Sequence, residues 1–322
     1  MKIYTASLIL IFLSTSVHSA NFSDTLRQAK KGNASAQASL ASMYANREGG
    51  QMNDEAAVRW YTKSAQQGYA EAQSNLGVMY DQGKGVIQDY KTAVKWYTRS
   101  AEQGIDMAQY NLGNMYNKGK GVIQDYKTAV KWYTRSAEQG VAAAQYNLGN
   151  MYNNGKGVIQ DYKAAVKWYT LAAEQGRPDA QYNLANMYNK GKGVIQDYKA
   201  AVKWYTRSAE QGDAMAQNNL GNMYDRGKGV IQDYKTAVKW YTLAAEQGHA
   251  NAQYNLGVMY NKGEGVIGDN VYAHMWANIA RSNGYENASK VLDILVKKMT
   301  PSQIEKAQDL ARECVKKNYK GC

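Results

Sequence analysis

Tyrosine and asparagine recur along this sequence at a spacing that suits contact with a ligand. Tyr110 and Asn114 lie four residues apart, which places them on one helix face. Tyrosine offers rigid contact area and asparagine offers adaptable hydrogen bonds, a mixture found in paratopes. The pattern predicts a partner-binding groove. The alternative is that these side chains pack and hydrogen-bond between neighbouring elements. The predicted groove residues are Tyr110, Asn114, Tyr146, Asn150, Tyr182, Asn186, Asn222 and Tyr254.

Cations form a second periodic set. Lys127, Lys131 and Arg135 follow one another at four-residue intervals, and similar triplets occur elsewhere in a chain of net charge +12. Stacked copies would align into a basic band that attracts anionic surfaces over a distance. The alternative is a solvated face that aids solubility. The basic band comprises Lys91, Lys95, Lys127, Lys131, Arg135, Lys199, Lys203 and Arg207.

Motifs for catalysis are missing from the sequence. It contains no H-E-x-x-H, no S-x-x-K and no K-T-G, and His249 and His274 stand in no local motif. The repeated GKG lacks the strand and spacing of a phosphate-binding loop. We therefore expect no enzymatic activity, no cofactor and no bound metal. The competing hypothesis is an envelope hydrolase of the β-lactamase or peptidoglycan-acting type.

A fixed period organises these residues. Tryptophan recurs every 36 residues, and an Ala-Gln pair keeps the same period from residue 36 to residue 253. Such a period is typical of a solenoid, in which each repeat buries its apolar face against its neighbours. The seven tryptophans are Trp60, Trp96, Trp132, Trp168, Trp204, Trp240 and Trp276.

The first half of each repeat predicts a helix and a loop. In residues 106–118, apolar side chains fall at i, i+4, i+7 and i+8. Gly119 and Gly121 then permit backbone angles that a helix does not use. We expect either Val122 or Ile123 to turn inward from this loop. Helix starts are indicated by Asn33, Asp106, Asp213 and Pro178.

The second half of each repeat predicts a second helix. Asp125 is a good N-cap, and the aspartates at its 36-residue equivalents are interpreted as caps and not as calcium ligands. Trp132 and Tyr133 are expected to pack inside, not to stack on nucleic acid. Gly140 is expected to end the helix. Each repeat is therefore a helical hairpin.

The repeat resembles a known family. The pattern A-x-A-Q-x-x-L-G-x-M-Y-x-x-G-x-G-V-x-x-D-Y-x-x-A-V-x-W-Y is similar to the Sel1-like repeat, a relative of the tetratricopeptide repeat. The resemblance implies an all-α fold, an α/α superhelical solenoid of seven 36-residue hairpins over residues 33–284, with adaptor or scaffold roles. Arg47, in place of a loop glycine, and Ala277, in place of tyrosine, mark atypical terminal repeats.

The chain ends predict export and capping. Lys2, the apolar run of residues 8–13 and the small residues at 19 and 20 indicate a signal peptide over residues 1–20, with Ala20 or Asn21 as the mature N-terminus. A lead-in or cap helix is expected over 21–32 and capping helices over 285–322. We expect a periplasmic, secreted or cell-surface protein without a membrane span. Its partners would be protein and, through the basic band, anionic envelope polymers, but not nucleic acid.

The two cysteines lie close together near the C-terminus. An exported chain meets oxidising conditions, in which Cys314 and Cys322 are expected to pair. Thr300 and Gln303 form a predicted capping box at the start of the last helix. Packing, not cross-linking, must therefore hold the rest of the chain together.

Overall fold

The protein is an all-α solenoid in the computed structural model, which describes residues 22–46 and 53–322. Regular structure within these residues is entirely helical. The predicted signal peptide and Arg47 lie outside the described residues. The described residues form two compact units, residues 22–46 with 53–160 and residues 161–322.

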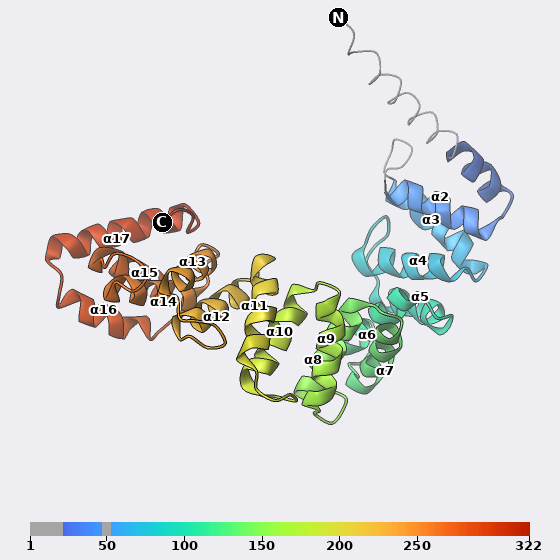
Figure 1. Ribbon diagram of the computed structural model, residues 1–322. Helices are drawn as coiled ribbons and strands as arrows, with labels where there is room; N and C mark the ends of the chain where they lie inside the picture. Colours follow the sequence, from blue (N-terminus) through green and yellow to red (C-terminus); the bar gives the residue numbers. More distant parts are fainter. Residues whose placement is uncertain (1–21, 47–52) are drawn as a thin grey trace, which may run out of the picture. The chain divides into compact units, whose positions relative to one another are not determined.

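The first unit begins with a helical segment over residues 22–30, inside the predicted lead-in region. Three and a half helical hairpins follow, and each helix packs on the next one along the chain (Figure 1). The helices are α2 (Ala34–Ala45), α3 (Asp54–Gln66), α4 (Ala70–Gln82), α5 (Tyr90–Glu102), α6 (Asp106–Lys118), α7 (Tyr126–Glu138) and α8 (Ala142–Asn154).

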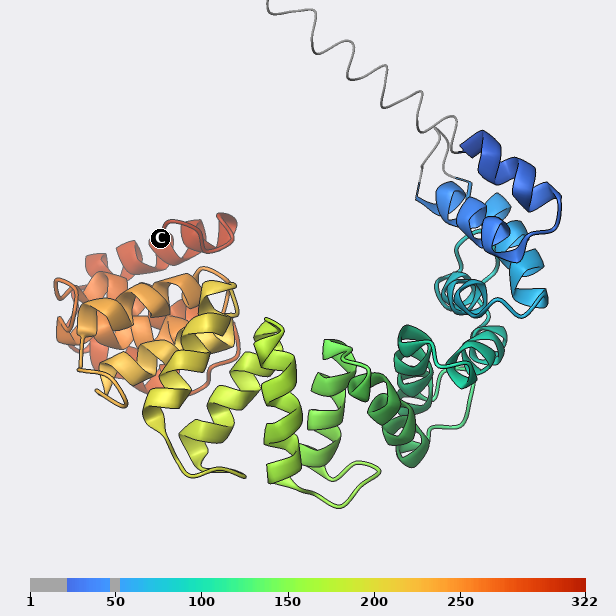
Figure 2. The same cartoon turned by 45° about the vertical axis from the view of Figure 1, so that its right-hand side comes forward.

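The second unit continues the same succession. Its helices lie side by side in chain order, and both α16 and α17 pack on α15 (Figure 2). The helices are α9 (Tyr162–Glu174), α10 (Pro178–Lys190), α11 (Tyr198–Glu210), α12 (Ala214–Asp225), α13 (Tyr234–Ala245), α14 (Ala250–Lys262), α15 (Asn270–Ser282), α16 (Ala288–Val296) and α17 (Pro301–Lys316).

Helix ends follow the predicted capping residues with one exception. The Asp125 side chain accepts hydrogen bonds from the backbone N–H groups of Lys127 and Thr128, as an N-cap does. Asn33 and Asp213 cap α2 and α12 in the same way. Asp106 differs, because it is the first residue of α6 and Ile105 occupies the cap position.

The core of each repeat is built from small and large side chains that both helices contribute. Leu112 and Tyr133 are fully buried. Gly113 makes this packing possible, because a Cβ at that position would lie 2.7 Å from Cδ1 of Tyr133. In this repeat, the close approach of the two helices thus depends on a missing methyl group.

Buried glutamines connect successive repeats. Gln109 is 4% exposed, and its Nε2 donates to the carbonyl oxygen of Ala101 in the preceding repeat, at 3.1 Å. Its Oε1 accepts from Nε2 of Gln139 at 2.8 Å. The same donation to an alanine carbonyl is made by Gln37, Gln73, Gln145, Gln181, Gln217 and Gln253. These bonds satisfy amides that would otherwise be buried at a cost of about 1–3 kcal/mol each.

The loop between the helices docks on the preceding repeat. Gly121 has φ +71°, and a Cβ there would overlap the backbone of Tyr90, so only glycine fits. Val122 is half-buried against the core, whereas Ile123 is 90% exposed. The structure therefore selects Val122 from the two predicted inward residues.

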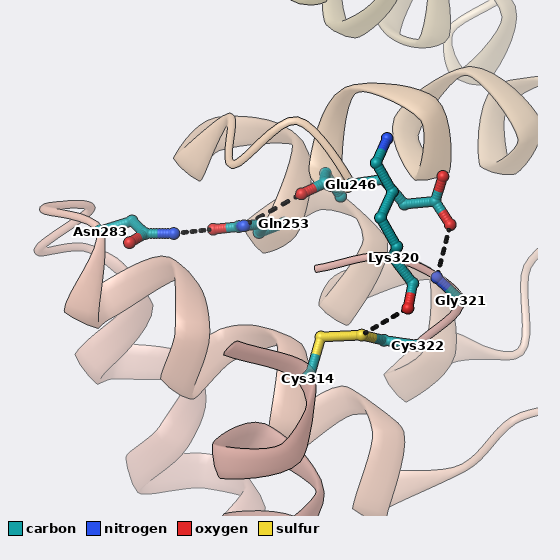
Figure 3. The surroundings of a disulfide bond; sticks show 8 residues. Glu246, Gln253, Asn283, Cys314, Lys320, Gly321 and Cys322 are labelled. Carbon is teal, nitrogen blue, oxygen red and sulfur yellow. Dashed lines mark hydrogen bonds between the residues drawn. A yellow bond between two sulfur atoms is a disulfide. The ribbon is translucent and has the colours of Figure 1, made fainter. Parts of the chain in front are cut away.

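The C-terminal segment closes the second unit. Thr300 and Gln303 form the predicted capping box at the start of α17. Cys314 and Cys322 are joined in a disulfide (Figure 3). The backbone N–H of Gly321 donates to Glu246 at 3.0 Å, which ties the tail to the end of α13. The C-terminal segment therefore packs on the last repeat through α15 and reaches the repeat before it through Glu246.

Candidate functional site

A cleft of about 350 Å3 lies between the first helices of two successive repeats in the second unit. It is formed by α10, α11, α12 and the loop that follows α12, and its size is within the usual range of ligand sites. Three predicted groove residues, Tyr182, Asn186 and Asn222, line it. The full lining is Tyr182, Asn186, Asn189, Lys190, Tyr205, Asn219, Asn222, Met223, Arg226 and Lys228.

The hydroxyl of Tyr205 orients the amides of the cleft. Burial raises the pKa of Tyr205, so its O–H remains a donor. It donates to Oδ1 of Asn186 at 2.7 Å, and its oxygen accepts from Nδ2 of Asn219 at 3.3 Å. Because Oδ1 of Asn186 is occupied in this way, its NH2 group is the end left to meet a ligand.

Three exposed cations supply the charge of the cleft. Lys190 is the last residue of α10, Arg226 is the C-cap of α12, and Lys228 belongs to the next loop. Among the ion pairs formed within residues 22–46 and 53–322, none uses these three side chains. Lys228 Nζ lies 5.3 Å from the ring centroid of Tyr198. Since no carboxylate lines the cleft, it favours an anionic ligand.

Carboxylates occupy the equivalent positions one repeat later. Asp225 and Glu264 stand where the cleft has Asn189 and Lys228, 36 residues earlier. Burial, and next the charge of Glu264, raise the pKa of Asp225. Lys262 Nζ forms an ion pair with Glu264 at 3.3 Å. We call the space between the first helices of two successive repeats a step. The step from α12 to α14 therefore has acidic groups that the step from α10 to α12 lacks.

The remaining predicted groove residues are divided between the two units and are half-buried. Tyr110, Asn114, Tyr146 and Asn150 belong to the first unit. Asn114 Oδ1 accepts from the hydroxyl of Tyr133 at 2.8 Å. Tyr254, in the second unit, lies with its ring centroid 4.7 Å from that of Tyr285. These side chains thus combine packing within the solenoid with partial exposure, and the cleft contains only Tyr182, Asn186 and Asn222 of the set.

The basic band is interleaved with tryptophan. Its cations are exposed on the second helices, and the guanidinium carbon of Arg135 lies 4.9 Å from the ring centroid of Trp132. Trp132 is 7% exposed, as expected for an interior residue. Trp168 and Trp240 are half-buried, and leucine replaces arginine three residues after each. Arginine therefore covers the tryptophan face, and part of the band acts in packing.

Other kinds of site find less support in the part of the chain that the structure describes. Groups of three or more His, Cys, Asp or Glu suited to a metal do not occur within residues 22–46 and 53–322. His274 is buried, and burial lowers its pKa. No helix among the described residues has both the length and the apolar character that a membrane span requires.

Sequence reasoning missed the cations of the cleft, because they come from helix ends and a loop of successive repeats. Arg226 was the available signal, since it replaces the lysine of the equivalent positions 118, 190 and 262 and the asparagine of position 154. Asn218, which replaces the usual tyrosine in the same repeat, was a second signal. Asn218 lies in α12, and Arg226 is the C-cap of the same helix.

Stacked helical hairpins with a cleft between their first helices define the class of α/α repeat proteins. The chain belongs to the Sel1 repeat family, whose model matches residues 34–69, 70–105, 106–141, 142–176, 178–213, 214–249 and 250–285. The family resemblance seen in the sequence is thereby confirmed, and so is the all-α solenoid. No curated protein matches this sequence.

Solved structures include similar chains. A Sel1 repeat protein from Oxalobacter formigenes is 37% identical, with a TM-score of 0.67, over 85% of this chain and 79% of that one. A protective antigen of uropathogenic Escherichia coli, described as displaying an SLR fold, is 28% identical over 92% of this chain and 96% of its own, with a TM-score of 0.48.

Proposed function

We propose that this protein is an exported, non-catalytic scaffold that binds a protein partner along the first helices of its repeats. The observation that carries the proposal is the cleft between α10 and α12, with its amide, tyrosine and cationic lining. The Sel1 repeat solenoid supports it, because such solenoids are typical of protein-interaction scaffolds. The partner would meet half-buried aromatic and amide side chains, which suit recognition of a polypeptide.

Site-specific photo-cross-linking tests partner binding. A photoreactive phenylalanine analogue replaces Tyr182, which lines the cleft, in the full chain expressed in its own cell. The control carries the same group at Ile195, which is 91% exposed on a loop. We expect a discrete cross-linked protein from position 182 only. Cross-links from position 195 alone would contradict the proposed face.

Export and the absence of catalysis have separate tests. Mass spectrometry of protein from the periplasm or the medium should give Ala20 or Asn21 as the first residue, and an intact Met1 would contradict processing. The pure protein should hydrolyse neither nitrocefin nor muropeptides. Turnover of either compound would favour the competing hypothesis of an envelope hydrolase. At the cell envelope, the basic band would add attraction to anionic polymers, screened beyond about 10 Å at 0.1 M salt.

A further inference from the structure

We infer that the cleft between α10 and α12 binds a carboxylate-bearing stretch of an extended acidic polypeptide. This inference rests on the proposed function, because it names the chemistry of the partner at that site. Its starting point is the composition of the lining, which has three cations, four asparagines, two tyrosines, a methionine and no carboxylate.

The positions of the cations favour a carboxylate side chain. Lys190 and Arg226 end two helices, at equivalent positions of successive repeats, and both are exposed. A cation at a helix C-terminus meets the negative end of the helix dipole, so its own helix partly satisfies it. Because the same helix ends repel an anion, a ligand carboxylate would gain most from contact with both cations together. Arginine is well suited to this role, because its planar fork can hold a carboxylate through two hydrogen bonds.

The neutral part of the lining favours a peptide backbone. Tyr205 keeps its proton and occupies Oδ1 of Asn186, so the asparagine presents N–H donors toward the cleft. Asn189 adds an amide from the same helix, α10, whereas Asn222 lines the cleft from α12 with its amide committed, since its Oδ1 accepts from Tyr241 and its Nδ2 donates to the carbonyl of Asn218. Side-chain amides can donate to backbone carbonyls and accept from backbone N–H groups, which carboxylates and cations cannot do together. The Tyr182 ring offers an apolar surface beside them.

The next step of the second unit is unfavourable for an acidic ligand. One repeat later, Asp225 and Glu264 replace Asn189 and Lys228, so a second carboxylate group would meet like charges. Charge complementarity thus favours a short acidic stretch held at Lys190 and Arg226 over an acidic polymer that continues into the next step.

Fluorescence anisotropy with the full chain tests the inference. The probe is a short fluorescein-labelled peptide of alternating glutamate and glycine, and its control replaces each glutamate with glutamine. We expect the acidic peptide to bind about tenfold more tightly, since two charge pairs at an accessible site each contribute a modest amount. Equal binding of the two peptides would overturn the inference.

Matched variants locate the binding. K190N and R226N introduce the residue that the chain itself uses at the equivalent position 154, so both should fold. The double variant should lose the preference for the acidic peptide, while K118N, at the same repeat position in the first unit, should change affinity less than about twofold. Equal losses in R226N and K118N would show general basic attraction and overturn the assignment to the cleft.

Competition separates a polypeptide from other carboxylate polymers. Polygalacturonate carries carboxylates without peptide bonds, and at matched carboxylate concentration it should displace the probe poorly. Equal displacement would overturn the assignment to a polypeptide. If Tyr182 cross-links a partner while the acidic probe shows no preference, the inference fails and the proposed function stands. If the probe binds the cleft but no protein cross-links there in the cell, the proposed function fails.

Discussion

Two neighbouring steps of the second unit share one frame and differ in charge. From α10 to α12, Tyr205 donates to Asn186; from α12 to α14, Tyr241 makes the equivalent bond to Asn222 at 3.0 Å. The first step is lined by three cations, whereas Asp225 and Glu264 enter the second. The tyrosine–asparagine hydrogen bond is therefore the same in both steps. The residues at the helix ends and in the following loop determine the charge of the ligand that each step favours.

Transferring the acidic pair into the cationic step should have the largest effect. The variant N189D/K228E gives the cleft the residues found one repeat later. It removes one positive charge and adds two negative ones, so acidic-peptide binding should weaken about 100-fold, at roughly 1 kcal/mol for each unit of charge. Anisotropy measures the change. Undiminished binding would show that the two steps do not differ in charge recognition.

The shared frame predicts equal losses of stability in the two steps. Gly229 and Gly265 both have φ +73°, and a Cβ at either would overlap the backbone of the preceding repeat. G229A and G265A should each lower the free energy of unfolding by about 2 kcal/mol or more. Urea denaturation followed by circular dichroism measures this. G212A is the control, since φ is +92° there but nothing lies within 4 Å of the added Cβ. A loss in G212A as large as in G229A would mean that docking of the loop contributes nothing.

Removing one acidic group next to the cleft should strengthen the binding of the acidic peptide. The carboxylate of Asp225 acts electrostatically on Arg226, its neighbour in the chain. D225N should therefore tighten acidic-peptide binding about threefold at low salt, and the gain should shrink at high salt because the charges are exposed enough to be screened. A gain that persists in high salt would indicate a local rearrangement instead of a charge effect.

The smallest expected effect is a pH-dependent change in stability at the same residue. Asp225 has a raised pKa in the folded protein, so folding favours its protonated form. Its contribution to stability is therefore present below the ordinary pKa of 3.8 and is lost as the pH rises through the raised value. D225N should raise Tm slightly at pH 7 and leave it unchanged near pH 3. Differential scanning fluorimetry of both proteins across this range checks the sign, and a gain confined to acid pH would contradict it.

Local residue preferences made most of the fold predictable. Asp125 and Gly119 fix the beginning and end of helices through bonds and backbone angles that involve only nearby residues. Leu112 and Tyr133 fill the core because their spacing is that of a helix face. The choice between Val122 and Ile123 was not predictable, since both are apolar neighbours and the path of the loop decides which one turns inward.

The candidate site was predictable only in part, because it depends on contacts between repeats. Helix periodicity indicated Tyr182 and Asn186, but not that Oδ1 of the asparagine would be occupied by Tyr205. Lys190 and Arg226 are 36 residues apart and meet at one cleft only through stacking. The sequence predicts surface charge for the arginines of the basic band, whereas in the structure Arg135 also covers Trp132. The prediction that the band attracts anionic surfaces remains a prediction.

The buried glutamines have a consequence for the length of the protein. Gln109 and Gln145 each donate to an alanine carbonyl eight residues earlier in the chain, and each meets the same surroundings in its own repeat. Deleting residues 106–141 would bring the amide of Gln145 to the carbonyl of Ala101, so no buried donor would be orphaned. Repeats can thus be lost or duplicated in frame while the stack remains satisfied. The cationic step, which occurs once with Arg226, would keep its chemistry as the number of repeats changes.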